Sequence, residues 1–320
     1  MTFGAETDEA EAHRMLDVFV ERGGTLIDTA DVYSDGLSEQ IIGRWGAARG
    51  GSDDLIIATK CRFLPTPGSP GASRRAVLRR AEASLKRLQL DAIDLFFIHG
   101  WDDDTDVMET LQALGDLVTE GKIHHIGWSN VTGWQLERIC ATARAHNLPM
   151  PVALQPQYSL LDRGIELEVL PCALENRVGL TPWSPLGGGW LTGKYSADVQ
   201  PSGATRLGEN PDRGVEAYDK RNTEHTHAVL RAAREVAERR GRPVAHVALA
   251  WLASRPGVSS ILLGARNAEQ LEANLDSIDL DLTKDDLAVL TRVSSPGLPD
   301  YPYGFVRDWS KVMHWSRLGT

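Results

Sequence analysis

The 320-residue chain has no long hydrophobic run, only three cysteines and no excess of positive charge. No stretch approaches the roughly 18 consecutive apolar residues that a membrane-spanning helix needs. Residues 1–13 also lack the basic and apolar regions of a signal peptide. Acidic residues number 44 against 34 basic ones, a formal charge of −10, which disfavours nucleic acids and anionic membranes as partners. We therefore expect neither kind of partner.

The cysteines, Cys61, Cys140 and Cys172, lie far apart and match no metal-binding spacing. An odd number of cysteines also cannot form a complete disulfide framework. A reducing compartment fits this usage best, so we expect a cytoplasmic protein without a metal. Nothing in the sequence fixes its oligomeric state.

Short apolar runs alternate with amphipathic stretches along the whole chain, which is the pattern of repeated strand–helix units. The expected strands cover residues 25–28, 55–60, 93–99, 123–129, 152–155, 179–183 and 259–264. The expected helices include residues 9–21, 73–88, 106–120, 132–146, 225–240 and 243–254. Residues 1–4 could be the tail of a further, leading strand.

Continuous apolar strands are typical of a parallel sheet buried on both faces. Seven or eight such units favour an α/β fold of the (β/α)8 (TIM) barrel type, as one domain over residues 1–320. The alternative is an open doubly wound sheet, which usually carries a glycine-rich phosphate turn after its first strand. No GxGxxG pattern follows an early strand here.

In such barrels the chemistry lies at the carboxyl ends of the strands. Those ends carry Asp28, Lys60 and His99, and Tyr33 follows five residues after Asp28. An ammonium beside a phenol favours the phenolate and so makes the phenol a better proton donor. The carboxylate can orient the ammonium, and the imidazole can hydrogen-bond a carbonyl oxygen. The set polarises and protonates a carbonyl but supplies no hydride, which implies a cofactor.

These residues and further motifs resemble the aldo-keto reductase family, in the branch of bacterial general reductases and potassium-channel β subunits. The matching segments are DTADVY (28–33), ATK (58–60), FFIHGWD (96–102), GWSN (127–130), QPQYS (155–159), WSPLGGGWLTGK (183–194) and GARNAEQLEAN (264–274). The resemblance covers nearly the whole chain. It implies a (β/α)8 barrel that reduces aldehydes or ketones with NADPH and no metal, with Asp28, Tyr33, Lys60 and His99 as the catalytic residues.

The resemblance also implies how the cofactor is held. Hydroxyl and amide side chains, which both donate and accept, would bind the nicotinamide carboxamide, and an indole would stack on the ring. Glycines and nearby cations would follow the pyrophosphate, and the final motif would hold the adenosine and its 2′-phosphate. The carboxamide residues would be Ser129, Asn130 and Gln155, and the stacking indole would be Trp183. The pyrophosphate residues would be Ser184, Leu186, Gly188, Gly189, Lys194 and Arg206. The adenosine and its 2′-phosphate would be held by Gly264, Arg266, Gln270 and Asn274.

Some of these residues also have a purely structural interpretation. The glycines could form a flexible loop, Trp183 could belong to the barrel core, and Lys194 and Asn274 could be ordinary surface residues. The chain also departs from the family pattern. It begins at MTFG, without room for the usual N-terminal hairpin and most of the first strand, so we expect the barrel to lack both. Ala273 stands where this branch often has an acidic residue.

Substrate contacts are expected from the aromatic residues Phe63, Trp101, Tyr158 and Trp190, which suit an apolar or ring-bearing carbonyl compound. Two other functions stay open. One is a redox-sensing regulatory subunit that binds NADPH with little turnover. The other is a barrel that has lost its activity.

Overall fold

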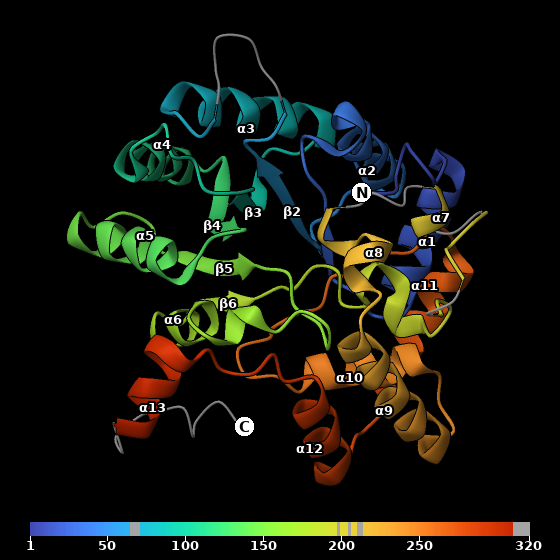
Figure 1. Cartoon of the computed structure of the whole chain (residues 1–320). Helices are drawn as coiled ribbons and strands as arrows, with labels where there is room; N and C mark the ends of the chain where they lie inside the picture. The colour runs from blue at the N-terminus through green and yellow to red at the C-terminus, as the bar shows by residue number, and fades with distance from the viewer. Residues whose placement is uncertain (65–70, 197–198, 204–205, 210–213, 310–320) are drawn as a thin grey trace. The chain divides into compact units, whose positions relative to one another are not determined.

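The computed structural model describes residues 1–64, 71–196, 199–203, 206–209 and 214–309 (Figure 1). The chain divides into two compact units. Unit 1 comprises residues 1–156, 171–181 and 262–275, and unit 2 comprises residues 157–170, 182–261 and 276–320. The interpretation of residues 1–320 as a single domain stays a prediction. Within the described part, no helix has both the length and the apolar character needed to cross a bilayer.

Unit 1 is built on a curled parallel sheet of six strands in sequential order (Figure 1). The strands are β1 (Leu26–Asp28), β2 (Ile56–Cys61), β3 (Ile93–Ile98), β4 (Ile123–Ser129), β5 (Pro151–Gln155) and β6 (Gly179–Leu180). On one face, Ala58, Leu95, Phe97 and Ala153 pack together. A Cβ atom at Gly127 would lie 2.5 Å from Cε1 of Phe97, so this strand position needs glycine.

The helices that connect these strands lie along the outside of the sheet (Figure 1). They are α1 (Glu9–Glu21), α2 (Leu37–Ala48), α3 (Arg74–Leu88), α4 (Val107–Thr119), α5 (Gly133–Ala145) and α6 (Val169–Glu175), and α11 (Ala268–Leu275) packs against α1. Two N-termini show why the helices begin where they do. Asp106 accepts a hydrogen bond from the Met108 backbone, and Thr132 forms a capping box with Gln135.

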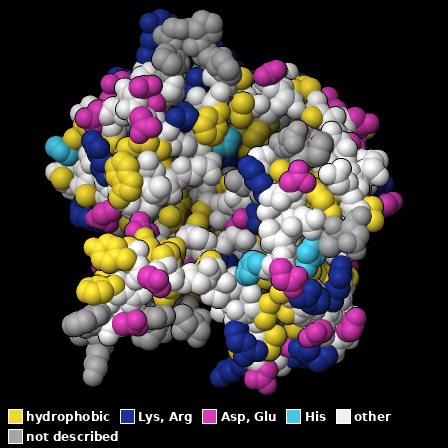
Figure 2. All heavy atoms as spheres, in the orientation of Figure 1, with side chains coloured by type: hydrophobic (Ala, Val, Ile, Leu, Met, Phe, Trp, Pro, Cys, Tyr) yellow, Lys and Arg dark blue, Asp and Glu magenta, His cyan; other side chains and the backbone are white. Residues whose placement is uncertain are grey.

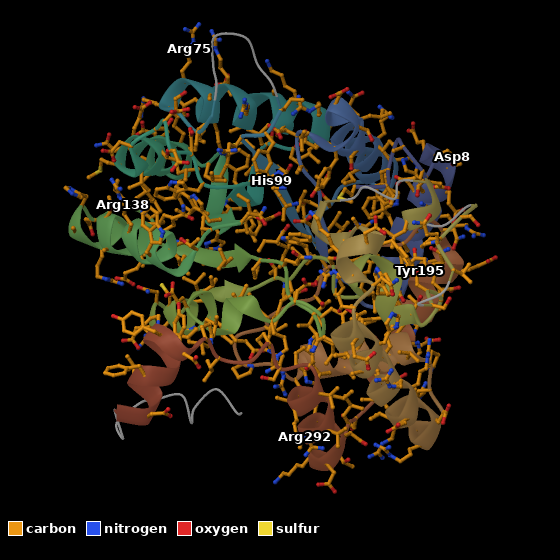
Figure 3. The ribbon with its side chains drawn as sticks, in the orientation of Figure 1. Asp8, Arg75, His99, Arg138, Tyr195 and Arg292 are labelled. Carbon is orange, nitrogen blue, oxygen red and sulfur yellow. The ribbon has the colours of Figure 1, made fainter. Side chains whose placement is uncertain are left out.

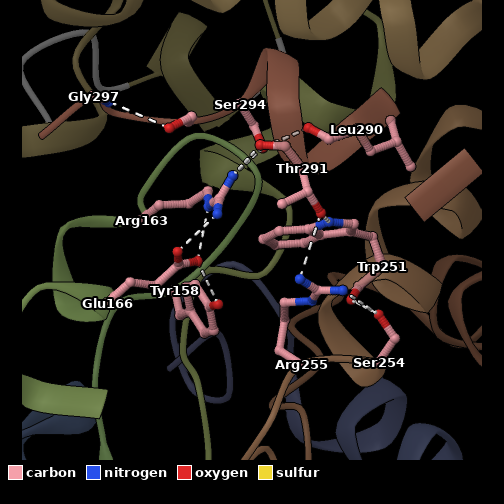
Figure 4. A network of polar contacts seen from close by, with 11 residues as sticks. Tyr158, Arg163, Glu166, Trp251, Ser254, Arg255, Leu290, Thr291, Ser294 and Gly297 are labelled. Carbon is pink, nitrogen blue, oxygen red and sulfur yellow. Dashed lines mark hydrogen bonds and ion pairs between the residues drawn. The ribbon is translucent and has the colours of Figure 1, made fainter. Parts of the chain in front are cut away.

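Unit 2 is helical in the residues that the structure describes. Its helices are α7 (Arg206–Glu209), α8 (Tyr218–Arg221), α9 (Glu224–Arg240), α10 (Val244–Ala253), α12 (Lys284–Val293) and α13 (Phe305–Trp309). Its core contains Trp190, Trp251 and the apolar faces of α9 and α10. The buried Arg163 guanidinium is held there by Glu166 and by the carbonyl of Thr291, and it lies over the Trp251 ring (Figure 4).

Two predicted strands are not formed. Residues 259–264 belong to no strand, and Phe3 makes only an isolated bridge to Thr7. An apolar run predicts burial, whereas a strand also needs a partner that completes its hydrogen bonds. The described part of the chain therefore contains six of the eight strands of the predicted barrel.

Candidate active site

The strands of unit 1 bring the four predicted catalytic residues together. Asp28 ends β1, Lys60 lies near the end of β2, and His99 directly follows β3. Tyr33 starts a short 3-10 turn, Tyr33–Gly36, after β1. The Lys60 ammonium lies 2.5 Å from Asp28 Oδ2, 2.6 Å from the Thr29 carbonyl and 3.4 Å from the Tyr33 hydroxyl. Asp28, Lys60 and Tyr33 therefore form one connected hydrogen-bonded group.

His99, which is labelled in Figure 3, directly follows β3 and stands beside this group. Its ring meets the Tyr33 ring edge to face at a centroid distance of 5.9 Å. Burial, together with the positive charges of Lys60 and Arg62, lowers the pKa of His99 to about 3. A neutral imidazole has one N–H donor and one acceptor, so His99 can hydrogen-bond a carbonyl oxygen without carrying charge.

Burial and charge oppose each other at Lys60 and Tyr33. Burial alone would lower the pKa of Lys60, but attraction to Asp28 and Tyr33 outweighs it and raises that pKa. Burial raises the pKa of Tyr33, and the Lys60 ammonium opposes this rise without reversing it. We expected Lys60 to bring the pKa of Tyr33 below its usual value, but burial outweighs Lys60 and the pKa is raised. Tyr33 keeps its proton at neutral pH and can act as a donor.

The three residues predicted to bind a carboxamide lie at the ends of β4 and β5. Gln155 donates from Nε2 to Asp28 Oδ1 at 2.9 Å, and Ser129 donates to the Gln155 carbonyl at 2.7 Å. Asn130, with a φ of 54°, donates to the His99 carbonyl at 2.9 Å. Gln155 and Asn130 are thus bonded directly to two of the predicted catalytic residues.

Three of the predicted phosphate-binding residues, Ser184, Gly188 and Gly189, lie in the short turn Gly187–Thr192 or shortly before it. Ser184, Gly188 and Gly189 have φ values of 54°, 68° and 96°. Successive left-handed residues can turn backbone N–H groups toward an anion. Ser184 accepts from the Gly188 N–H and donates to the buried carboxylate of Glu216. A Cβ atom at Gly188 would lie 3.1 Å from Cδ of Glu216.

The other predicted residues of unit 2 surround this turn in the sequence. Trp183 is half-buried, and its carbonyl accepts a hydrogen bond from the Tyr158 N–H. Leu186 is half-buried against the core of unit 2. Lys194 is exposed, with Nζ 5.1 Å from the centroid of the Tyr195 ring. Arg206 begins α7, and its side chain lies outside the described part of the structure.

The predicted adenosine-binding motif of unit 1 spans the start of α11. Gly264 and Gln270 are exposed, and Arg266 and Asn274 are half-buried. The Arg266 N–H donates to Gln270 Oε1 at 3.1 Å, which folds this glutamine back over the helix start. Sequence reasoning missed Glu11 of α1, whose carboxylate accepts a hydrogen bond from the Ala268 N–H at 2.6 Å.

The four aromatic residues predicted to contact substrate fall into two groups. In unit 1, the exposed Phe63 ring lies 4.8 Å from the His99 ring, and Trp101 packs against the exposed Trp134 at 5.4 Å. Sequence reasoning also missed Trp134, although it follows Asn130 by only four residues.

Tyr158 and Trp190 belong to the second group and have no exposed surface. They pack in the core of unit 2, where the Tyr158 hydroxyl donates to Glu166 and the Trp190 ring stacks on Tyr218. The structure therefore gives these two side chains no surface for a substrate.

No group of three or more histidine, cysteine or carboxylate side chains in the described ranges is arranged to hold a metal ion. Acidic and basic side chains are mixed over the face shown in Figure 2.

Comparison with known proteins identifies the family. The model of the aldo/keto reductase family matches residues 1–295. The chain belongs to the aldo/keto reductase family. It is similar to the protein tas of Escherichia coli, with 34% identity over 92% of both chains. It is also similar to a probable voltage-gated potassium channel subunit beta of Arabidopsis thaliana, with 32% identity over 88% of this chain and 85% of that one.

A third relative carries an activity in its name. The norsolorinic acid reductase stcV of Emericella nidulans is 33% identical over 86% of this chain and 70% of its own. Family membership makes the chain an oxidoreductase and implies a (β/α)8 barrel.

Proposed function

We propose that this aldo/keto reductase uses NADPH to reduce an aldehyde or ketone to an alcohol. The observation that carries the proposal is the buried Lys60 ammonium, which is hydrogen-bonded to both Asp28 and Tyr33 with a neutral His99 alongside. This arrangement has a proton donor, a cation to stabilise the donor's anion and a neutral hydrogen-bonding group. Those are the requirements for protonating a carbonyl oxygen as its carbon accepts a hydride.

The residues present fit a nicotinamide dinucleotide. His99 Nδ1 is buried without a hydrogen-bond partner in the described residues, so it is suited to a polar ligand. Gln155 and Asn130 present amide groups at the ends of their strands, and the left-handed backbone at Ser184, Gly188 and Gly189 suits an anion. We assign the nicotinamide carboxamide to Ser129, Asn130 and Gln155.

The remaining cofactor contacts follow the family resemblance. The ring is assigned to Trp183, the pyrophosphate to the turn that contains Gly188 and Gly189, and the adenosine 2′-phosphate to Arg266. Ser184, Leu186, Lys194, Arg206, Gly264, Gln270 and Asn274 complete the proposed set.

In the proposed reaction, bound NADPH supplies the hydride that the carbonyl carbon accepts. Tyr33 gives its hydroxyl proton to the carbonyl oxygen, and the resulting phenolate is stabilised by the Lys60 ammonium. Asp28 holds Lys60 in place through its 2.5 Å contact. His99 hydrogen-bonds the same oxygen from the side and stays neutral throughout.

The accessible aromatic side chains support a ring-bearing or apolar substrate. Phe63 covers the His99 ring and is 43% exposed, and Trp101 lies two residues beyond His99. Aromatic side chains bind rings through large apolar contact areas. Tyr158 and Trp190 are left out of this proposed wall because both are core residues. The free cysteines, two of them buried, support a reducing compartment such as the cytoplasm.

Replacement of Tyr33 by phenylalanine tests the proposal. We expect kcat for aldehyde reduction to fall about 10²–10⁴-fold, the range for general acid catalysis, with NADPH affinity nearly unchanged. Tyr301→Phe is the matched control, because Tyr301 is largely exposed on the segment before α13. Stopped-flow and steady-state NADPH oxidation, with a fluorescence titration of NADPH, measure both quantities. Near-wild-type turnover by Tyr33→Phe would overturn the assignment.

The second candidate function is a regulatory subunit that binds NADPH and turns over little. Similarity to a potassium channel subunit beta favours it. Steady-state NADPH oxidation against a panel of aromatic and aliphatic aldehydes separates the two functions. A reductase turns over repeatedly, whereas a sensor of this kind stops near one turnover for each bound NADPH.

A further inference from the structure

Gln155 contacts the predicted catalytic group directly, although the sequence suggests only a cofactor contact for it. It is the last residue of β5 and is buried, with 2% of its surface exposed. Its Nε2 atom lies 2.9 Å from Asp28 Oδ1. Because a carboxylate only accepts hydrogen bonds, the amide nitrogen must be the atom that faces Asp28.

Asp28 is therefore held from two sides. Its Oδ1 atom accepts from Gln155, and its Oδ2 atom accepts from Lys60 at 2.5 Å. The two contacts fix the rotation of the carboxylate. The donated N–H also takes up part of the negative charge, which would otherwise draw the Lys60 ammonium away from Tyr33, 3.4 Å from Lys60 Nζ.

The backbone of Gln155 is anchored as well. The Ser129 hydroxyl donates to the Gln155 carbonyl at 2.7 Å, and Ser129 pairs with Gln155 in the parallel ladder of β4 and β5. The backbone of Gln155 is therefore held in the sheet, which fixes the point from which its side chain reaches Asp28.

We propose that Gln155 is a positioning residue that holds Asp28, and through it Lys60, in the arrangement that lets Tyr33 release its proton. The inference rests on the proposed carbonyl reduction. With Nε2 bonded to Asp28, the Oε1 atom is the end of the amide that would accept a hydrogen bond from a nicotinamide carboxamide. Hydrogen bonds in a chain polarise one another, so a carboxamide held by Oε1 would strengthen the Gln155–Asp28 bond.

Two substitutions separate this role from simple packing. Gln155→Met keeps the length of the side chain and removes its N–H donor. Gln155→Glu also keeps the length but donates to Asp28 only when its own carboxyl group is protonated. The titratable groups that face Tyr33 are Asp28 of β1, Lys60 of β2, His99 after β3 and Asp31 of its own loop. All four are unchanged in both variants.

The experiment is the pH profile of kcat for aldehyde reduction at saturating NADPH. We expect Gln155→Met to lower kcat about tenfold or more, the effect of losing a hydrogen bond to a charged group. Its alkaline inflection should move to higher pH, because Tyr33 holds its proton more tightly when Lys60 shifts toward Asp28. Gln155→Glu should regain activity as the pH falls. A loss of packing alone would lower kcat equally at every pH.

Gln112→Met is the matched control, since it makes the same substitution at an exposed position of α4, away from the residues assigned to the site. It should keep the wild-type inflection. If Gln155→Met keeps the wild-type kcat and the wild-type inflection, this inference is wrong, while the proposed function still stands. If Gln155→Met does not fold, a Gln155→Glu profile parallel to the wild type would overturn it. No turnover by the wild type would overturn the proposed function, and this inference with it.

Discussion

Asp31 lies inside unit 1 with its carboxylate 4.0 Å from the Nε atom of Arg80, and both side chains are buried. Within the described residues, neither carboxylate oxygen of Asp31 accepts a hydrogen bond of ordinary geometry. The nearby Val32 N–H lowers the pKa of Asp31 slightly. Arg80 also donates to the carbonyls of Leu64 and Gly71. The ion pair thus connects the loop that carries Tyr33 to the segments that follow β2.

The buried carboxyl group makes stability depend on pH. Burial raises the pKa of Asp31 to about 7, against the opposing attraction of Arg80. The folded protein therefore holds this proton more tightly than the unfolded chain, whose pKa is near 3.8. The resulting stabilisation is fully present below about pH 4 and is lost as the pH rises toward 7. A difference of about three pKa units corresponds to at most ~4 kcal/mol.

Urea unfolding of the wild type and of Asp31→Asn between pH 4 and pH 8 tests this expectation. The wild type should lose free energy of unfolding relative to the variant as the pH rises. Subtracting the two curves of unfolding free energy against pH cancels the contributions of the other titratable groups. Asp53→Asn, at an exposed turn position, should give a constant difference from the wild type. A constant difference for Asp31→Asn would show that the carboxyl group does not titrate in this window.

His99 should act without a change of charge. Because its pKa is lowered to about 3, the ring stays neutral from pH 5 to pH 8. His99→Gln should lower kcat about 10²–10³-fold, as expected for losing one hydrogen bond to developing charge. The ratio of wild-type to variant kcat should be independent of pH in this range. A ratio that changes around pH 6.5 would show that the imidazole titrates and that its environment is more polar than described.

The elements with local signals were predicted well from the sequence. Residues 9–21 form α1 with the same bounds, and the predicted ends at Asp106 and Thr132 are N-caps in the structure. Periodicity and capping depend on neighbours within a few residues, so the sequence contains them directly. The placement of Asp28, Lys60 and His99 at neighbouring strand ends could be predicted for a related reason, since each ends an apolar run.

What depends on distant partners could not be predicted in the same way. The run at 259–264 is as apolar as the true strands but has no strand partner. Tyr158 and Trp190 look like pocket residues because they are aromatic and adjacent to motifs, yet both are in the core of unit 2. The bond from Gln155 to Asp28 joins residues 127 positions apart. No local pattern indicates such a contact.

Glu216 should weaken cofactor binding. Its carboxylate contacts Ser184 and lies next to Gly188, in the turn assigned to the pyrophosphate. Like charges at short distance repel, and burial makes the repulsion stronger. Glu216→Gln should therefore bind NADPH more tightly than the wild type, by several-fold or more. Fluorescence titration measures the change, with Glu238→Gln on the exposed side of α9 as the control. Weaker binding by Glu216→Gln would mean that this carboxylate supports the cofactor site.

Arg266 should decide the choice between NADPH and NADH. It follows the Gly264 turn and precedes α11, and its half-buried side chain keeps part of its surface exposed. Arginine is always charged and binds phosphate with two parallel hydrogen bonds. NADPH carries a 2′-phosphate and NADH does not. One charged hydrogen bond contributes about 1.5–3 kcal/mol, or roughly 10–150-fold in affinity.

We therefore expect the wild type to prefer NADPH by at least about tenfold in Kd, and the preference to weaken with added salt. Arg266→Ala should remove most of this preference by weakening NADPH binding, while NADH binding barely changes. Arg138→Ala, at an exposed position of α5, controls for the loss of a surface charge and should keep the preference. Fluorescence titration with NADPH and with NADH, at low and high salt, measures both Kd values for the wild type, Arg266→Ala and Arg138→Ala. Equal wild-type affinities for the two cofactors would show that Arg266 does not meet a phosphate, because no other difference between the cofactors could hide its effect.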